Sequence, residues 1–405
     1  MEVFMARQPI FNTKMQVVAY ELLYRSGSKN TYDLSIDGDL ATTSVVVDTL
    51  INFGIQKLTN NKVAYINFTR KSLMENLPTL FDQERLTVEI LETLEVDEDL
   101  IEKCKYLKSI GYTIALDDFS GDEKFDAIIP YVDILKVDFL VLKSEGRAYI
   151  ANKYKTSNLK LLAEKVETQK DYEEAKRFGY QLFQGYFFEK PVICKTKGLQ
   201  SSMLNYLEIL NETMNENADF GKMADIIKRD FSLTYKLLRL INSPAFYTVQ
   251  EITSVNQALT LLGLNEIRKW TTLIMLRDIS SEKPDELVKV SLVRALFAER
   301  LATLFGLENR KTEAFLMGLF SLIDTIMDKP LFDIFEPLPL KSDVKAAMMG
   351  VGNAFHDILV VLRHYEVGDF DRVMHVTESR NINNSDVSDH YINAVDEATR
   401  LYLAM

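Results

Sequence analysis

The sequence is poor in cysteine and has no long uncharged apolar run. Its 405 residues include two cysteines, Cys104 and Cys194, which are too few for a disulfide framework and fit a reducing compartment. No stretch approaches the roughly 18 apolar residues of a membrane span, and the first ten residues lack the features of a secretory signal. We therefore expect a cytoplasmic protein with no membrane partner.

A basic stripe is also missing, and the net charge is −12. Binding to nucleic-acid phosphates needs clustered positive charge, so we expect no direct nucleic-acid partner. An acidic balance suits a site for divalent metal ions instead. With 47% hydrophobic and 26% charged residues, the chain can bury large cores and is long enough for two domains.

Short apolar, β-branched segments recur through the first half of the chain. They read VVAYELLYR, VAYINFT, LTVEILE, TIALDDF, ILKVDF, LLAEKVE and YQLFQGYFF. Helical patterns run between them over 40–54, 97–111 and 170–179. Strands that alternate with helices form parallel sheets with right-handed crossovers, and about seven such units favour closure. The pattern predicts an α/β fold, a TIM-type (β/α) barrel.

Most of these segments end on an acidic or amide residue. The strand-end side chains are Glu21, Asn67, Glu89, Asp117, Asp118, Lys136, Asp138, Glu164, Glu167 and Gln184. In such barrels the chemistry lies at the C-terminal ends of the strands. An unpaired buried charge costs about 3–5 kcal/mol, so several converging carboxylates indicate bound cations.

The pattern changes after Pro191, where breakers and lysines form a linker. Beyond it the β-patterned runs stop and helical periodicity takes over. We predict two domains, a barrel over 1–195 and an all-helical domain over 200–405. The most apolar stretch, Phe315 to Met327, contains Asp324 and is interpreted as a buried helix.

Taken together, the motifs of residues 4 to about 191 resemble the EAL family, bacterial phosphodiesterases and receptors for cyclic di-GMP. The motifs that carry the resemblance are Gln8-Pro9-Ile10, Glu21-Leu22-Leu23-Tyr24-Arg25, Asn67, Glu89 with Glu92, Asp117-Asp118-Phe119, Lys136-Val137-Asp138, Glu164-Lys165-Val166-Glu167 and Gln184-Gly185-Tyr186.

The resemblance implies a two-metal site for Mg²⁺ or Mn²⁺ and hydrolysis of cyclic di-GMP to linear pGpG. One ion would be held by Glu21, Asn67, Glu89 and Asp117, and a second by Asp117, Asp118 and Glu164, because hard cations prefer such oxygens. Lys136 and Glu164 would orient and deprotonate the attacking water. Arg25, Gln8 and Gln184 would contact phosphate or guanine, while Glu92 and Glu167 would support the loops.

Three departures from the family pattern bear on activity. Ser120-Gly121-Asp122-Glu123-Lys124-Phe125 replaces the usual Gly-Thr-Gly-Tyr-Ser-Ser loop, which positions the second metal and couples barrels in a homodimer. Lys165 replaces a small glycine, and it could pair with Glu167 or occupy the place of a metal. Leu22 replaces the signature alanine and adds bulk beside Glu21.

The second half, from about 200 to 370, resembles the HDOD family, helical relatives of HD-type metal phosphohydrolases. The resemblance rests on the segments Leu237 to Pro244, Ile252 to Ala258 and Leu261 to Leu264. Ser321 and Asp324 stand where HD enzymes place their His-Asp pair. The resemblance implies a domain without catalysis that acts through contact with a protein partner.

Three classes of function remain open at this point. The first is an active cyclic di-GMP phosphodiesterase with a helical regulatory domain, which the residue inventory favours. The second is a catalytically inactive receptor for cyclic di-GMP, and the third is a protein-interaction scaffold that binds no nucleotide. Fold alone does not choose among them.

Overall fold

The computed structural model describes residues 3–26, 55–189, 201–215, 217–242, 252–280, 283–328 and 340–404, with Leu331, Ile334 and Leu338. The chain divides into two compact units. The first comprises Met1–Lys190 and His364–Met374, and the second comprises Pro191–Arg363 and His375–Met405. The helix predicted over 40–54 and the linker around Pro191 lie outside the described residues.

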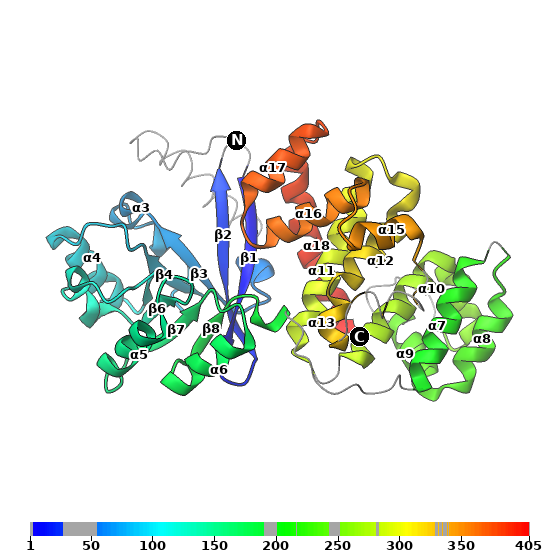
Figure 1. Ribbon diagram of the computed structural model, residues 1–405, viewed down its shortest axis with the longest axis horizontal. Helices are drawn as coiled ribbons and strands as arrows, with labels where there is room; N and C mark the ends of the chain where they lie inside the picture. Colours follow the sequence, from blue (N-terminus) through cyan, green and yellow to red (C-terminus); the bar gives the residue numbers. More distant parts are fainter. Residues whose placement is uncertain are drawn as a thin grey trace. The chain divides into compact units, whose positions relative to one another are not determined.

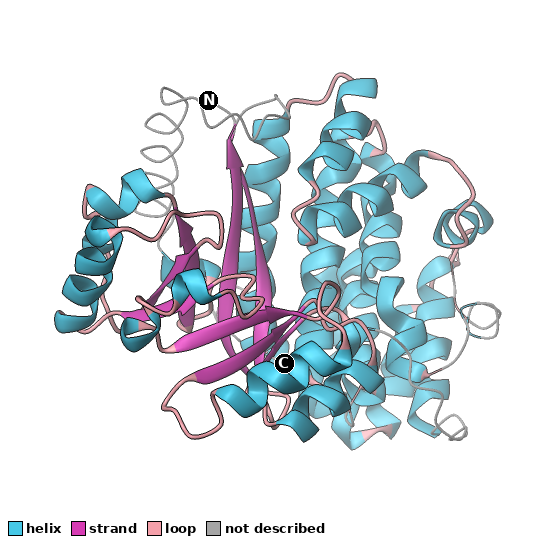
Figure 2. Ribbon diagram, turned by 60° about the vertical axis from the view of Figure 1, so that its left-hand side comes forward, coloured by secondary structure: helices cyan, strands magenta, loops and turns pink. Residues whose placement is uncertain are grey.

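The strands of the first unit form a closed barrel in the order β1 to β8. They are drawn as magenta arrows in Figure 2. The strands are β1 (Val3–Asn12), β2 (Val17–Ser26), β3 (Val63–Phe68), β4 (Leu86–Ile90), β5 (Thr113–Leu116), β6 (Ile134–Asp138), β7 (Lys160–Glu164) and β8 (Leu182–Gln184). The prediction of a TIM-type barrel is thus confirmed.

The expectation of an entirely parallel sheet is wrong, because β1 runs antiparallel to both of its neighbours, β2 and β8. A turn of four residues joins β1 to β2. Asn12 organises it by accepting the backbone N–H groups of Lys14 and Gln16 at 2.9 and 3.0 Å, and Met15 takes a positive φ of 59°. So short a connection permits only an antiparallel pair, since a parallel one needs a crossover.

Two layers of inward-facing side chains fill the barrel, and the apolar layer lies below the polar one. The apolar layer consists of Ile10, Ala19, Tyr65, Ala115, Ile134 and Leu162. Each lies two positions from a polar residue on the same strand or, for Asp117, directly after it, and side chains two apart share a face. The polar partners, in the same order, are Gln8, Glu21, Asn67, Asp117, Lys136 and Glu164. The apolar layer therefore forms the floor of the polar one.

Helices α4 (Glu98–Ser109) and α6 (Gln169–Phe178) confirm two of the helical predictions. Asp97 caps α4 by accepting the N–H of Leu100 at 3.0 Å. Gly179 ends α6 with a φ of 97°, a conformation that favours glycine. Helix α5 (Ser144–Lys153) lies between β6 and β7 in sequence.

The described part of the chain from Ser201 onward is helical, coloured from green to red in Figure 1, and it includes the segment His364–Met374 of the first unit. The helices are α7 (Ser201–Met214), α8 (Phe220–Arg229), α9 (Phe231–Ile241), α10 (Val255–Ile279), α11 (Asp285–Leu304), α12 (Lys311–Leu319), α13 (Ile323–Met327), α15 (Ser342–Met348), α16 (Ala354–Glu366), α17 (Phe370–Ser379) and α18 (Asn384–Ala404). The described part of the chain contains no helix that is both long enough and apolar enough to cross a membrane.

The apolar stretch from Phe315 to Met327 is buried but is not one helix. A 3-10 turn, η6 (Phe320–Leu322), separates α12 from α13. Gly318 allows α12 to approach α11 closely, since a Cβ there would lie 2.3 Å from the backbone oxygen of Arg294. A glycine is therefore required at this contact.

The segment His364–Met374 belongs to the first unit, although it follows most of the second in sequence. Phe370 stacks on Phe4 of β1 with ring centroids 5.0 Å apart. The hydroxyl of Tyr365 accepts the backbone N–H of Met5 at 3.3 Å. This segment therefore contributes to the packing around β1.

Candidate functional site

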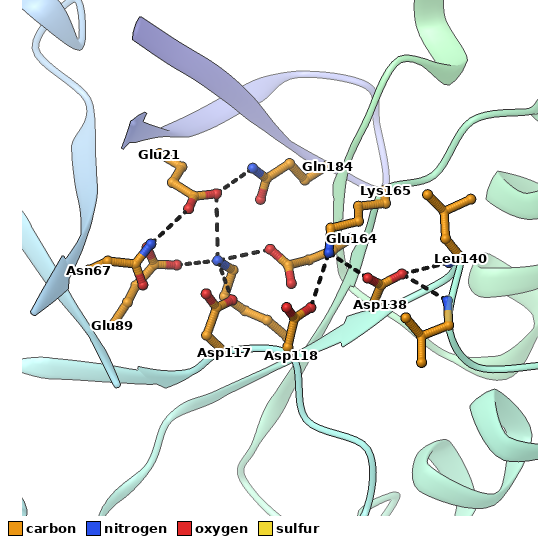
Figure 3. Close-up of polar contacts among 12 residues, drawn as sticks. Glu21, Asn67, Glu89, Asp117, Asp118, Asp138, Leu140, Glu164, Lys165 and Gln184 are labelled. Carbon is orange, nitrogen blue, oxygen red and sulfur yellow. Dashed lines mark hydrogen bonds and ion pairs between the residues drawn. The ribbon is translucent and has the colours of Figure 1, made fainter. Parts of the chain in front are cut away.

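The Lys136 side chain is fully buried within the polar layer. The four acids that pair with it, Glu21, Glu89, Asp117 and Glu164, are labelled in Figure 3. Lys136 Nζ is 2.8 Å from Asp117 Oδ1, 2.8 Å from Glu164 Oε1 and 3.5 Å from Glu21 Oε2, and it also pairs with Glu89. These residues come from five neighbouring strands or strand ends, β2 and β4 to β7. The structure thus brings four of the predicted acids together around one ammonium group.

Charge within this cluster is unbalanced, because four acids surround one lysine. Burial alone would lower the pKa of Lys136, but Glu164, Glu21, Glu89 and Asp117 together raise it well above its usual value. Burial, followed by the charge of Glu21, raises the pKa of Glu89, and burial also raises the pKa of Glu164. Lys136 is therefore an ammonium ion, and the acids favour additional positive charge.

Amide side chains fix the orientation of Glu21. Asn67 Nδ2 donates to Glu21 Oε1 at 3.2 Å, and Gln184 Nε2 donates to Glu21 Oε2 at 2.5 Å. Gln184 Nε2 also lies 2.7 Å from Gln8 Oε1. The predicted metal and substrate ligands therefore form one hydrogen-bonded chain across β1, β2, β3 and β8.

Several oxygens in this layer suit a hard cation. The buried Asn67 Oδ1 and Glu89 Oε2 accept no hydrogen bond from the described residues, whereas Glu89 Oε1 is paired with Lys136. Among those residues, no three acids enclose a point where a metal ion fits, since the Lys136 ammonium lies between them. The donor chemistry of Glu21, Asn67, Glu89 and Asp117 fits a divalent ion such as Mg²⁺, and the ion would have to displace Lys136 from the acids.

A second polar group adjoins the first. Lys165 Nζ lies 2.5 Å from Asp138 Oδ2 and 3.4 Å from Asp118 Oδ1 (Figure 3). The other oxygen of Asp138 accepts the backbone N–H groups of Leu140 and Val141 at 2.6 and 3.1 Å. The Lys165 ammonium group thus lies between two acids, Asp118 and Asp138.

Backbone geometry directs Asp118 and Lys165 toward each other. Both have a positive φ, 41° and 51°, a conformation that aspartate adopts more readily than lysine does. Burial, followed by the charge of Asp117, raises the pKa of Asp118. The acids expected for a second metal are thus divided, because Asp117 and Glu164 contact Lys136 whereas Asp118 contacts Lys165.

Gly185 holds Gln184 in place. The N–H of Val166 donates to the carbonyl of Gln184 at 2.9 Å, so the two backbones run close together. A Cβ at Gly185 would lie 2.2 Å from the oxygen of Val166, and φ there is 141°. The close approach to Val166 therefore requires a glycine directly after Gln184.

The divergent loop Ser120–Phe125 is packed against the barrel. Phe125 is buried and meets Phe119 edge to face at 6.3 Å. Lys124 Nζ donates to the carbonyl of Glu92 at 3.0 Å, and Asp122 caps the short turn η2 (Glu123–Phe125). The carboxyl of Glu92 is half-buried, and burial raises its pKa, with Asp118 and Asp117 contributing.

Other predicted residues are placed less completely. Arg25 pairs with Phe4 in the ladder between β1 and β2, but its side chain lies outside the described residues. Glu167 is exposed beyond the end of β7. Sequence reasoning gave Asp138 no role, although it lies two positions after Lys136 and therefore faces the same side of β6. This spacing of two residues is the sequence signal that places Asp138 on the same face of β6 as Lys136.

In the second unit, Ser321 is engaged in hydrogen bonds within the protein. Its hydroxyl donates to the carbonyl of Gly318 at 2.7 Å and receives a bond from Arg294 Nη1 at 3.3 Å. The side chain is buried. A serine hydroxyl in this arrangement supports packing of α11 against α12.

Comparison with known proteins finds two family domains along the chain. Residues 47–191 match the EAL domain, and residues 201–328 match the HDOD domain. The Bacillus subtilis protein YuxH is 41% identical over 385 residues, which is 92% of each chain. The Vibrio cholerae cyclic di-GMP phosphodiesterase CdgJ is 34% identical over 372 residues, 91% of this chain and 86% of the relative.

The chain belongs to the family of these EAL–HDOD proteins. Solved structures with lower similarity include Bacillus subtilis YkuI, in complex with cyclic di-GMP and calcium, at TM-score 0.40 and 19% identity over 56% of this chain and 71% of that one. Klebsiella pneumoniae BlrP1, with calcium and cyclic di-GMP, gives TM-score 0.40 and 20% identity over 47% and 56%. Helices α7 to α12 fall within the HDOD match, and β3 to β8 within the EAL match.

Proposed function

We propose that the EAL domain of this chain hydrolyses cyclic di-GMP to linear pGpG. Membership of a family that includes a cyclic di-GMP phosphodiesterase supports this proposal. The observation that carries it is the ring of inward-facing carboxylates and amides at one edge of the barrel, with Lys136 at its centre. So much buried negative charge is costly unless it serves a cationic partner.

The residues divide into those for cations and those for nucleotide. Glu21, Asn67, Glu89 and Asp117 would hold a divalent cation, either Mg²⁺ or Mn²⁺, with Asp118 and Glu164 beside them. Bound cations would supply Lewis acidity toward water and phosphate oxygens. Gln8, Arg25 and Gln184 would recognise phosphate or guanine, since guanidinium and amide groups offer paired donors or acceptors.

Lys136 and Glu164 would handle the attacking water. Lys136 is held as an ammonium ion, so it would donate a hydrogen bond to the water or to a phosphate oxygen rather than take a proton. Burial raises the pKa of Glu164 above its ordinary value, which makes this carboxylate a stronger base than an exposed one. Their contact at 2.8 Å would keep the pair aligned.

The test incubates the purified full chain with cyclic di-GMP and Mg²⁺ or Mn²⁺, and separates the products by chromatography. We expect pGpG from the wild type and loss of turnover by about 10²–10⁴ in Glu164→Gln. Glu84→Gln, at an exposed site, is the matched control and should retain full activity. Absence of pGpG with either metal contradicts a phosphodiesterase.

A nucleotide receptor without hydrolysis is the second candidate, because Lys165 and the loop Ser120–Phe125 both alter the region of Asp118. Calorimetry with cyclic di-GMP separates the two readings. Binding without turnover assigns the receptor role. If the chain neither binds nor hydrolyses cyclic di-GMP, the scaffold role remains. In that role the HDOD domain recruits a protein and the barrel supports it.

The HDOD domain would act through contact with a protein partner, and the barrel would pair with a second copy of itself. The Ser321 hydroxyl, bonded within the domain, supports a structural rather than a catalytic use of that position. Light scattering of the full chain would measure the homodimer. A monomer at all accessible concentrations would exclude it.

A further inference from the structure

Lys165 lies beside Asp118, one of the acids expected to receive a second divalent cation. Its Nζ is 3.4 Å from Asp118 Oδ1 and 2.5 Å from Asp138 Oδ2. Of these acids, Asp118 stands in the Asp-Asp pair that also supplies Asp117 to the central cluster. The ammonium group therefore satisfies part of the charge that a second metal would otherwise balance.

Asp138 anchors this arrangement firmly. One carboxylate oxygen accepts two backbone N–H groups, those of Leu140 and Val141, and the other contacts Lys165. Asp138 is also the ladder partner of Glu164, so the residue after Glu164 starts beside it. Displacing Lys165 would leave one oxygen of a buried carboxylate without its cation.

The backbone at Lys165 points to the same conclusion. Its φ of 51° favours glycine or asparagine, yet the chain carries a long cationic side chain there. In this left-handed conformation the side chain leaves β7 toward Asp118. Charge repulsion between the ammonium and a divalent ion a few ångströms away remains substantial near a protein surface.

We propose that Lys165 is a tethered counter-cation that takes the place of the second divalent ion at Asp118, so that the chain holds one such ion tightly. The inference rests on the proposed function, because it assumes that the central cluster binds a divalent cation. It specifies that Glu21, Asn67, Glu89 and Asp117 form the occupied site. Lys165 is thus a residue that determines metal stoichiometry.

The experiment counts Mn²⁺ ions bound to the full chain by equilibrium dialysis and by the electron paramagnetic resonance of free Mn²⁺. We expect one tight Mn²⁺ per wild-type chain. Lys165→Asn keeps a side chain suited to a positive φ but removes the charge, so it should strengthen binding of a second ion by at least about tenfold. Lys165→Arg keeps the charge and should behave as wild type.

Lys155→Asn is the matched control, since it removes one exposed lysine in the turn after α5 and should leave both affinities unchanged. Two ions bound with equal affinity by wild type and Lys165→Asn would overturn the inference while leaving the proposed function intact. If wild type binds no Mn²⁺, or if Asp117→Asn binds as much Mn²⁺ as wild type does, the proposed function is contradicted, and the inference with it.

Discussion

Gln184 and Glu21 are hydrogen-bonded at 2.5 Å although their strands, β8 and β2, are not neighbours. Strand β1 lies between them and pairs with both. Gln8 of β1 accepts a bond from the same amide, so the closure of the barrel and the orientation of a predicted metal ligand share one contact. Disturbing Gln184 should therefore affect stability and cation binding together.

Gln184→Met tests this coupling. The substitution keeps volume but removes the donor, leaving the buried Glu21 Oε2 with only its ion pair to Lys136, so the first unit should lose about 1–3 kcal/mol of unfolding free energy. Trp270, the single tryptophan, lies in the second unit, so circular dichroism is needed to follow the first. Gln169→Met, at an exposed site, should change stability by less than about 0.5 kcal/mol. Equal effects of the two substitutions would contradict the coupling.

Glu89 makes the metal-free chain sensitive to pH. Its pKa in the folded state lies well above the ordinary 4.5, because it is buried and close to Glu21. The folded state keeps a proton that the unfolded state releases, so the free energy of unfolding falls as pH rises above about 4.5. In EDTA, the free energy of unfolding of Glu89→Gln should therefore exceed that of the wild type by about 1–3 kcal/mol at pH 8, and by less at pH 5.

Urea unfolding at both pH values, with Glu84→Gln as an exposed control, measures this difference. Saturating Mn²⁺ should reverse the order, since a ligand at about 100 times its dissociation constant stabilises the wild type by roughly 2.7 kcal/mol. A Glu89→Gln advantage that does not grow with pH would show that crowding of acids is not the cause.

Much of the site followed from the sequence because strand periodicity is local. Side chains alternate with a period of two, so Asn67 and Glu89 could be assigned to one edge, and the ladder pairs them directly. The residues that mark the start of α4 and the end of α6 are also local signals, namely Asp97 and Gly179. Such signals need no knowledge of neighbours in space.

The remainder depended on contacts between distant segments. Lys165 pairs with Asp138 only because β6 and β7 are adjacent, and the sequence left its partner open. The antiparallel strand β1 was not predicted, because the sequence pattern did not identify Val3–Asn12 as a strand. Nothing local to Phe370 indicates that it stacks on Phe4, more than 300 residues earlier.

Gly185→Ala probes the close approach of β8 to the loop after β7. The added Cβ would meet the Val166 oxygen at 2.2 Å, so the backbone must shift and carry Gln184 with it. We expect a loss of about 2–4 kcal/mol together with weaker Mn²⁺ binding. Gly179→Ala is the matched control, since φ is also positive but no atom lies within 4 Å, and it should cost about 1 kcal/mol. Equal costs would mean that strain in φ, not the contact, explains Gly185.

Phe370→Ala tests whether His364–Met374 is part of the first unit. Phe370 is buried, stacks on Phe4 and meets Tyr365 edge to face at 5.4 Å, so truncation should cost about 3–5 kcal/mol. The loss should appear in the thermal transition that Mn²⁺ shifts, because that transition reports the unit with the cation site. Phe231→Ala, at a residue 85% exposed, should leave the transition in place. A Phe370→Ala effect confined to the Trp270 fluorescence transition would assign the segment to the second unit. By the same reasoning, a fragment that ends near Lys197 lacks Phe370 and should melt below the full chain, which differential scanning calorimetry would measure.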